Sequence, residues 1–186
     1  MLTVFLKLMS FIASVPRKVS PVVNTQLYSA ENILCKIIVK ARHAVSIDEN
    51  REDFVPTLWK DKPEIDLKQV WFAGIHSDVG GSYSDRGLSD CAMEWMIKEA
   101  GSSGLVFESH LYDGMHPDPS GKKHNEFKGI YSYCRKEYVR DIKGPIHISV
   151  KKRCGDERLS YLAKSRSLLK LLTSVQGNWE KIVVEE

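Results

Sequence analysis

A histidine that follows an apolar run and is flanked by glycines could do acid–base chemistry. The run from Leu67 to Ala73 leads directly into the segment that holds His76 and Asp78. An imidazole titrates near neutral pH, so it can take a proton from a hydroxyl group and return it to a leaving group. His76 and Asp78 are therefore the candidate catalytic residues, with the Asp78 carboxylate able to orient the ring. Three residues let the backbone turn sharply and approach a substrate, and are the candidate binding residues: Gly74, Gly80 and Gly81.

Other interpretations of this segment stay open. A histidine after a strand can be a hydrogen-bonded structural residue, and Asp78 can cap the backbone of its own turn. Asp85 and Asp90 follow closely and could hold a metal ion together with His76, but the spacing matches no ligand motif. No metal or other cofactor is therefore expected. Three further histidines are interpreted as solvated loop residues: His110, His116 and His124.

The elements around the histidine indicate an α/β fold. Residues 67–73 hold a continuous apolar run, which is typical of a strand buried on both faces of a parallel sheet. A helix is predicted to begin near Ser89, with this buried stripe: Ala92, Trp95, Met96 and Ala100. Strand, glycine-rich loop and helix in succession predict a mostly parallel sheet flanked by helices. In such folds the carboxyl end of a strand is where functional sites lie.

A strand and a helix are predicted upstream. Residues 2–15 are apolar apart from Lys7 and predict a strand, since the run is too short to span a bilayer as a helix. Ser29 is typical of a helix N-cap, and the helix is predicted to end near Asp48. Asp48 is expected to end the helix and to pair with Arg51. The apolar face of this helix is Ile33, Ile37, Ala41 and Ala44.

The second half of the chain has a weaker pattern. Residues 110–128 are rich in Asp, Pro, Gly, His and Lys and predict a long loop. A short apolar stretch lies at 146–150. A helix is predicted over about 160–174, and 178–186 predict a final strand or tail.

Composition excludes several classes of protein. The 27 Lys and Arg residues against 24 Asp and Glu residues give a net charge of +3, too small to indicate a nucleic-acid partner. The basic run at 151–153 is predicted to be a solvated surface segment. The chain has four cysteines, Cys35, Cys91, Cys134 and Cys154, and they form no C-x-x-C pair. This spacing disfavours a zinc knuckle and favours reduced, buried thiols in a protein that folds in a reducing compartment.

Two blocks of sequence resemble a known family. The first runs from Ala41 to Arg51 and continues through Phe54 to Trp59, and the second runs from Gln69 to Tyr83. The second block leads into Leu88-Ser89-Asp90 and Glu94-Trp95-Met96, and looser similarity follows at 118–125, 129–131 and 146–150. Together, over about residues 40–160, these blocks resemble the family once filed as DUF2235, now described as the catalytic domain of phospholipase effectors of the bacterial type VI secretion system.

The resemblance implies an α/β-hydrolase-like fold with a Ser-Asp-His triad that acts on ester bonds of phospholipids or similar lipids. His76 matches the histidine of that triad. The family's serine lies in an upstream G-x-S-x-G elbow, and this sequence contains no G-x-S-x-G. Ser10 stands where the family has its aspartate, and a hydroxyl cannot stabilise an imidazolium as a carboxylate does. Asp48 and Asp78 are the candidates to replace it.

The expected protein is therefore an incomplete α/β-hydrolase-like domain. Residues 1–186 are expected to form a single partial domain, with 1–27 a degenerate lead-in and 28–175 the family-like core. Alone, the chain is expected to be an inactive fragment of a lipid esterase; a non-catalytic binding module and a metal- or histidine-dependent enzyme are the alternatives. The resemblance implies a lipid or other ester substrate, contact with a membrane surface, and a secretion-system or immunity partner. It places the chain in the cytoplasm of the producing cell, with export as an effector when full length.

Overall fold

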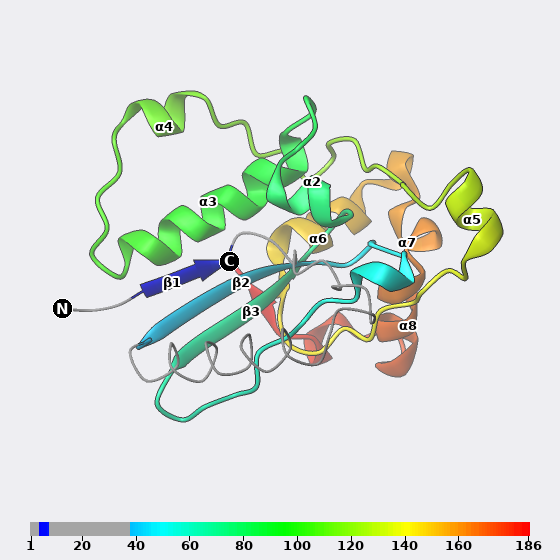
Figure 1. Cartoon of the computed structure of the whole chain (residues 1–186), viewed down its shortest axis with the longest axis horizontal. Helices are drawn as coiled ribbons and strands as arrows, with labels where there is room; N and C mark the ends of the chain where they lie inside the picture. Colours follow the sequence, from blue (N-terminus) through cyan, green and yellow to red (C-terminus); the bar gives the residue numbers. More distant parts are fainter. Residues whose placement is uncertain (1–3, 8–37) are drawn as a thin grey trace, which may run out of the picture.

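The structure is a computed structural model that describes residues 4–7 and 38–186 (Figure 1). Within these ranges, five strands form one parallel sheet, and strands adjacent in the sequence are adjacent in the sheet. The strands are β1 (Val4–Lys7), β2 (Lys40–Ser46), β3 (Asp66–Phe72), β4 (Ile146–His147) and β5 (Val184–Glu185). The predicted α/β class with a parallel sheet is confirmed.

Helices cover both faces of this sheet (Figure 1). The α-helices are α2 (His76–Gly80), α3 (Gly87–Gly101), α4 (His110–Asp113), α5 (Ile130–Cys134), α6 (Ile148–Gly155), α7 (Tyr161–Lys164) and α8 (Arg166–Ser174). Short 3-10 helices are η1 (Glu52–Phe54), η2 (Glu157–Leu159) and η3 (Trp179–Lys181).

Successive side chains of β2 and β3 enter two different cores. Val45 and Trp71 pack in a core that also contains residues of α6, α7 and α8. Ala44 and Phe72 pack on the opposite face with residues of α2 and α3. Side chains alternate between the faces of a strand, so the part of a strand that has helices on both sides is mostly apolar. The strand predicted at 67–73 is therefore confirmed, with β3 shifted by one residue.

The carboxyl ends of β2 and β3 lie side by side and carry the histidine segment. Ser46 is paired with Phe72 in the parallel register. Beyond these residues, the backbone N–H of Asp48 still donates to the carbonyl of Gly74 at 3.0 Å. The residues just after the two strands therefore face each other at one edge of the sheet.

The prediction of a helix that ends near Asp48 is wrong over residues 40–46, because these residues form the strand β2. Arg42 and His43, which lie on this strand, are both buried. The guanidinium of Arg42 pairs with Glu99 and donates to the Asp66 carboxylate at 2.8 Å. Partners distant in sequence thus satisfy a guanidinium that the fold buries. The Ser29 N-cap and the first part of the predicted helix lie outside the described residues.

The remaining predicted elements fit in part. The helix expected near Ser89 is α3, which begins two residues earlier, and the helix over 160–174 is divided at Ser165 into α7 and α8. The stretch 146–150 is β4 followed by α6, and the final strand is β5. The loop over 110–128 contains only the short helix α4. β1 confirms the start of the strand predicted at 2–15, and Ser10 lies outside the described residues.

Two surface predictions need correction. Arg153 was expected in a solvated segment, yet it is buried and donates from Nη1 to the carbonyls of Pro119 at 2.6 Å and Gly121 at 2.8 Å. Buried thiols were expected throughout, but Cys134 is exposed, whereas Cys91 is buried. Cys154 is partly exposed, and Cys35 lies outside the described residues. In the described part of the chain, no helix has the length and apolar character needed to cross a bilayer.

Candidate active site

His76 is paired with a buried carboxylate from the neighbouring strand. The imidazole lies at the start of α2, directly after β3, and its Nδ1 is 2.5 Å from Oε2 of Glu49. Glu49 follows β2 by three residues, and its side chain is fully buried. A carboxylate at Nδ1 favours the tautomer with its proton on Nδ1, so that Nε2 becomes the proton acceptor. This is the relation between acid and histidine in hydrolase triads.

Glu49 is held in its charged form by two donors. Burial alone raises the pKa of Glu49, but hydrogen bonds from His76 and Arg51 outweigh it and lower that pKa to about 2. Arg51 donates from Nε to Oε1 at 2.9 Å and from Nη2 to Oε2 at 3.0 Å. Glu49 is therefore ionised at neutral pH and can stabilise an imidazolium. Sequence reasoning missed Glu49 because its closeness to His76 follows from the pairing of β2 with β3.

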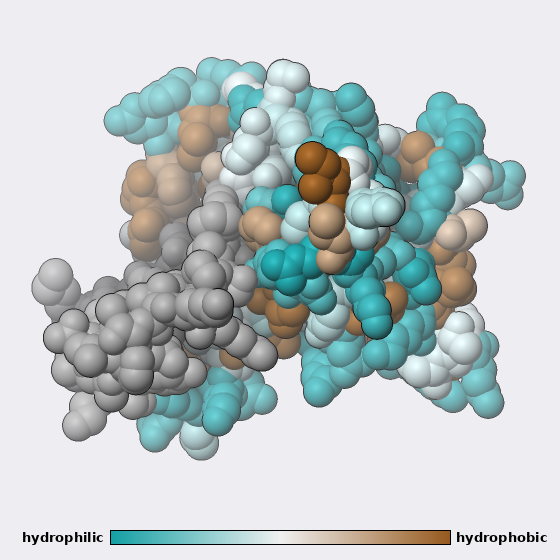
Figure 2. Space-filling model, turned by 45° about the vertical axis from the view of Figure 1, so that its right-hand side comes forward, coloured by the Kyte–Doolittle hydropathy of each residue, from teal (hydrophilic) through white to brown (hydrophobic). Residues whose placement is uncertain are grey.

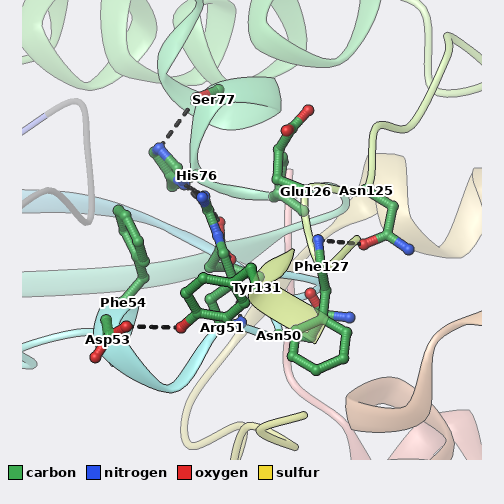
Figure 3. Close-up of polar contacts among 12 residues, drawn as sticks. Asn50, Arg51, Asp53, Phe54, His76, Ser77, Asn125, Glu126, Phe127 and Tyr131 are labelled. Carbon is green, nitrogen blue, oxygen red and sulfur yellow. Dashed lines mark hydrogen bonds and ion pairs between the residues drawn. The ribbon is translucent and has the colours of Figure 1, made fainter. Parts of the chain in front are cut away.

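Aromatic and guanidinium planes restrict the imidazole. The ring of Phe54 stacks on that of His76, with centroids 5.0 Å apart and an interplanar angle of 15° (Figure 3). The guanidinium of Arg51 lies 4.0 Å above the centroid of the Phe54 ring. His76 thus has a stacking partner on its plane and a hydrogen-bond partner at Nδ1, which together limit its rotation.

A hydroxyl lies at the second nitrogen of the ring. Oγ of Ser77 is 3.0 Å from Nε2 of His76 (Figure 3). Glu49, His76 and Ser77 therefore form a hydrogen-bonded chain in the order carboxylate, imidazole, hydroxyl. That order also connects the members of a serine-hydrolase triad.

Arg140 fixes the loop that carries Glu49. Its side chain is buried, with the residue 1% exposed, and donates from Nε to the carbonyl of Glu49 at 2.7 Å. Nη1 donates to the carbonyl of Ser46 at 2.7 Å, and Nη2 donates to that of Phe54 at 2.5 Å. Burial lowers the pKa of Arg140 to about 10, so the guanidinium stays charged at neutral pH. One side chain thus holds both ends of the loop.

Asp48 braces the site and does not pair with Arg51. Its Oδ2 accepts hydrogen bonds from the backbone N–H of Gly74 at 2.7 Å and from the hydroxyl of Tyr161 at 2.7 Å. Arg51 pairs with Glu49 instead. The expectation that Asp48 ends a helix and binds Arg51 is therefore wrong. It ties the histidine segment to α7.

Asp78 holds the long loop against α2. Its Oδ1 is 2.7 Å from Nδ1 of His124, and its Oδ2 accepts from the backbone N–H groups of Ile75 and His124. The ring of His124 stacks on Tyr83 with centroids 3.6 Å apart. The interpretation of His124 as a solvated loop residue is thus wrong, whereas His110 and His116 are exposed.

Gly74 meets a steric requirement of this arrangement. It adopts φ +105°, and a Cβ there would lie 2.5 Å from Cβ of Asp78. Gly80 lies in α2, and Gly81 ends it. Both line a hollow of about 350 Å³ beside Tyr83 and α3. The candidate binding glycines thus lie at two places: Gly74 just before His76 in the chain, and Gly80 and Gly81 at this hollow.

Replacing Asp78 by Ala is expected to release the loop over residues 117–128. Three hydrogen bonds lose their acceptor, so we expect about 2–3 kcal/mol of destabilisation and faster amide exchange in this loop. Hydrogen exchange followed by mass spectrometry and urea unfolding measure the two effects. Asp113→Ala, at an exposed position in α4, is the matched control. Unchanged exchange in the loop would contradict the role assigned to Asp78.

Metal-ligating residues do not gather here. Within residues 4–7 and 38–186, no three His, Cys, Asp or Glu side chains are grouped as a metal site would need. Asp90 pairs with Arg86 and accepts from the backbone N–H of His116, while Asp85 is exposed. These contacts place the metal candidates of the sequence in different surroundings.

Comparison with known proteins identifies the family. A family model described as the type VI secretion system (T6SS) phospholipase effector Tle1-like catalytic domain matches residues 6–99, a little over half of the chain. No curated protein and no solved structure matches the chain. The match includes Glu49 and His76, and the looser similarity after residue 118 lies outside it. The chain belongs to the Tle1-like catalytic-domain family of type VI secretion phospholipase effectors.

Proposed function

We propose that this chain carries the histidine–carboxylate half of a lipid ester hydrolase whose serine nucleophile is not in this sequence. The observation that supports the proposal most directly is the 2.5 Å contact between Nδ1 of His76 and the buried carboxylate of Glu49. His76 is the proposed general base and acid, and Glu49 takes the place of the aspartate that the family has and that Ser10 replaces. Asp78 is proposed to position the surrounding loop.

The proposed reaction follows from these positions. Nε2 of His76 accepts the proton of the attacking serine hydroxyl, and the serine oxygen forms an acyl ester with the carbonyl carbon of the lipid. The imidazolium, stabilised by ionised Glu49, returns the proton to the alcohol that leaves. A water molecule then attacks the acyl ester while His76 accepts its proton. The return of that proton to the serine oxygen releases the fatty acid. The proposed binding residues, which let the substrate approach, are Gly74, Gly80 and Gly81. The proposal also includes export of the full-length protein through the secretion system.

A binding module is the second candidate. Asp48, Asp78 and Gly74 all serve contacts between loops, so this edge of the sheet is rigid without any reaction to perform. A rigid scaffold of this kind can recognise a lipid headgroup or an immunity-type protein without a nucleophile. The two candidates differ in whether a chain joined to its serine elbow turns over substrate.

The purified chain is expected to release no product from fluorogenic fatty-acid esters above the level of its His76→Ala variant. The reason is the missing elbow, because a triad without its nucleophile retains only weak effects of binding. A Ser77→Ala variant is assayed in parallel, because the Ser77 hydroxyl lies at Nε2 of His76. Its matched control is Ser109→Ala, at an exposed position. Hydrolysis that disappears in both His76→Ala and Ser77→Ala, but not in Ser109→Ala, would place the nucleophile at Ser77 and overturn the proposal.

The positive half of the proposal needs the sequence upstream of Met1. Where the transcript encodes a G-x-S-x-G elbow there, the joined chain is expected to hydrolyse phospholipid in vesicles. His76→Ala should then reduce kcat by about a thousandfold or more, with KM little changed. Turnover that is insensitive to His76→Ala would refute the assignment of the base, and absence of any turnover would favour the binding module.

A further inference from the structure

We propose that α5 is a docking element for a negatively charged lipid bilayer. The inference rests on the proposed function for its biological sense but is tested without it. α5 and its flanks, residues 128–136, combine exposed apolar side chains with exposed lysines and contact the elements that hold His76. These three observations are argued in turn.

The face of α5 turned toward the protein is held by polar contacts. The hydroxyl of Tyr131 donates to Oδ2 of Asp53 at 2.8 Å (Figure 3). One turn later, Arg135 donates from Nη1 to the Glu52 carboxylate at 3.1 Å. Residues four apart lie on the same face of a helix, so Tyr131 and Arg135 together anchor α5 on η1.

Two apolar side chains of α5 face solvent and contribute to neither core. Ile130 is 85% exposed and Tyr133 is 93% exposed. Their spacing of three places them on one side of the helix. Single exposed apolar residues are common on proteins, and Val106, near the end of α3, is 95% exposed. What distinguishes Ile130 and Tyr133 is that polar contacts attach their helix while its apolar side chains face solvent.

Basic residues lie on both sides of this apolar pair, and two of them have acidic partners: Lys128 lies 3.7 Å from the Glu126 carboxylate, and Arg135 pairs with Glu52. Between residues 122 and 136 the chain has five Lys and Arg residues and a single acidic residue, Glu126. Lys128 and Lys136 are exposed immediately before and after α5. Isoleucine and tyrosine suit the boundary between headgroups and acyl chains, and lysines beside them are attracted by anionic headgroups. The combination fits an anionic lipid surface better than a neutral one.

The position of α5 relates this surface to the candidate active site. Tyr131 contacts Asp53, and the next residue, Phe54, stacks on the imidazole of His76. α5 projects at the edge of the molecule in Figure 1, and Figure 2 turns that side forward and shows small apolar areas among hydrophilic ones. A bilayer that contacts α5 would therefore lie beside the histidine that is proposed to act on lipid esters.

Co-sedimentation with vesicles tests the proposal. The full chain with His76→Ala, which leaves the lipid intact, is mixed with phosphatidylcholine vesicles with or without phosphatidylglycerol. We expect binding to the mixed vesicles that is at least about tenfold stronger than to pure phosphatidylcholine and that weakens with salt. Ile130→Ser with Tyr133→Ser, and separately Lys128→Glu with Lys136→Glu, should each weaken binding about tenfold.

Matched variants and three outcomes make the result decisive. Val106→Ser and Lys151→Glu alter exposed side chains elsewhere and should bind like the parent. Equal binding to both vesicle types, or binding unaffected by the α5 changes, overturns the proposal. No binding to any vesicle also overturns it and leaves α5 to a protein partner. Vesicle binding without hydrolysis by the joined, catalytically intact chain would refute the proposed function and leave this docking role standing.

Discussion

Glu49→Gln is expected to lower the free energy of unfolding at pH 7 by roughly 2–3 kcal/mol. The side chain is fully buried, so solvent does not screen its pairs with His76 and Arg51. Glutamine has nearly the same shape but no charge, and it leaves the Arg51 guanidinium without its carboxylate. Removing one partner of a buried pair costs more than the pair contributes, because the remaining charge stays desolvated.

The Glu49→Gln substitution should also change how the free energy of unfolding depends on pH. Glu49 has a pKa near 2 in the fold against 4.5 as the ordinary value, so its folded pKa is depressed. Such a group contributes stability that is complete above about pH 4.5 and is lost as the pH falls through that window toward 2. The difference in unfolding free energy between the parent and Glu49→Gln should therefore shrink steadily from pH 5 to pH 3. Urea unfolding at a series of pH values measures it.

Glu52→Gln is the control for this experiment. Glu52 pairs with Arg135 at the surface, where both side chains are substantially exposed. Exposed pairs contribute little, so this variant should stay within about 0.5 kcal/mol of the parent at every pH. A Glu49→Gln variant as stable as the parent at pH 7 would mean that the carboxylate is not held as the contacts indicate.

The sequence predicts β3, the histidine segment and α3 because these carry local signals. Residues 67–73 hold an apolar run bounded by Gly74, and α3 has a regular buried stripe. β2 carries no such signal. It contains Arg42 and His43, and a strand with these residues becomes stable only when Glu99 and Asp66 lie beside the guanidinium. Such partners are set by tertiary structure, which a periodic pattern does not contain.

The candidate site divides in the same way. His76 is predictable because its type, its glycines and its place after a strand all lie within one short segment. Its carboxylate partner is not, because Glu49 precedes it by 27 residues and meets it only through the register of two strands. Asp78 shows the converse. It is close to His76 in sequence, yet its carboxylate binds His124, 46 residues away.

Arg140→Met is expected to destabilise the fold by about 3–5 kcal/mol. The guanidinium is the donor to three backbone carbonyls, those of Ser46, Glu49 and Phe54. Methionine fills much of the volume but donates nothing, so these acceptors lose their partner where water has little access. Unfolding in guanidinium chloride should show a lower midpoint concentration of denaturant with an unchanged slope. Because the same carbonyls hold the loop of Glu49 and Arg51, amide exchange in residues 47–54 should also rise.

A graded comparison separates lost hydrogen bonds from lost volume. Arg140→Lys keeps the charge but has a compact ammonium that cannot span all three carbonyls, so it should recover about half of the loss. Arg158→Met removes an exposed arginine that pairs with the Asp156 carboxylate, and should change stability by less than about 0.5 kcal/mol. If Arg140→Met and Arg158→Met were equally mild, the loop would be held by the β2–β3 pairing and by Asp48. If Arg140→Lys were as damaging as Arg140→Met, the planar fork of the guanidinium, rather than its charge, would be what positions Glu49 beside His76.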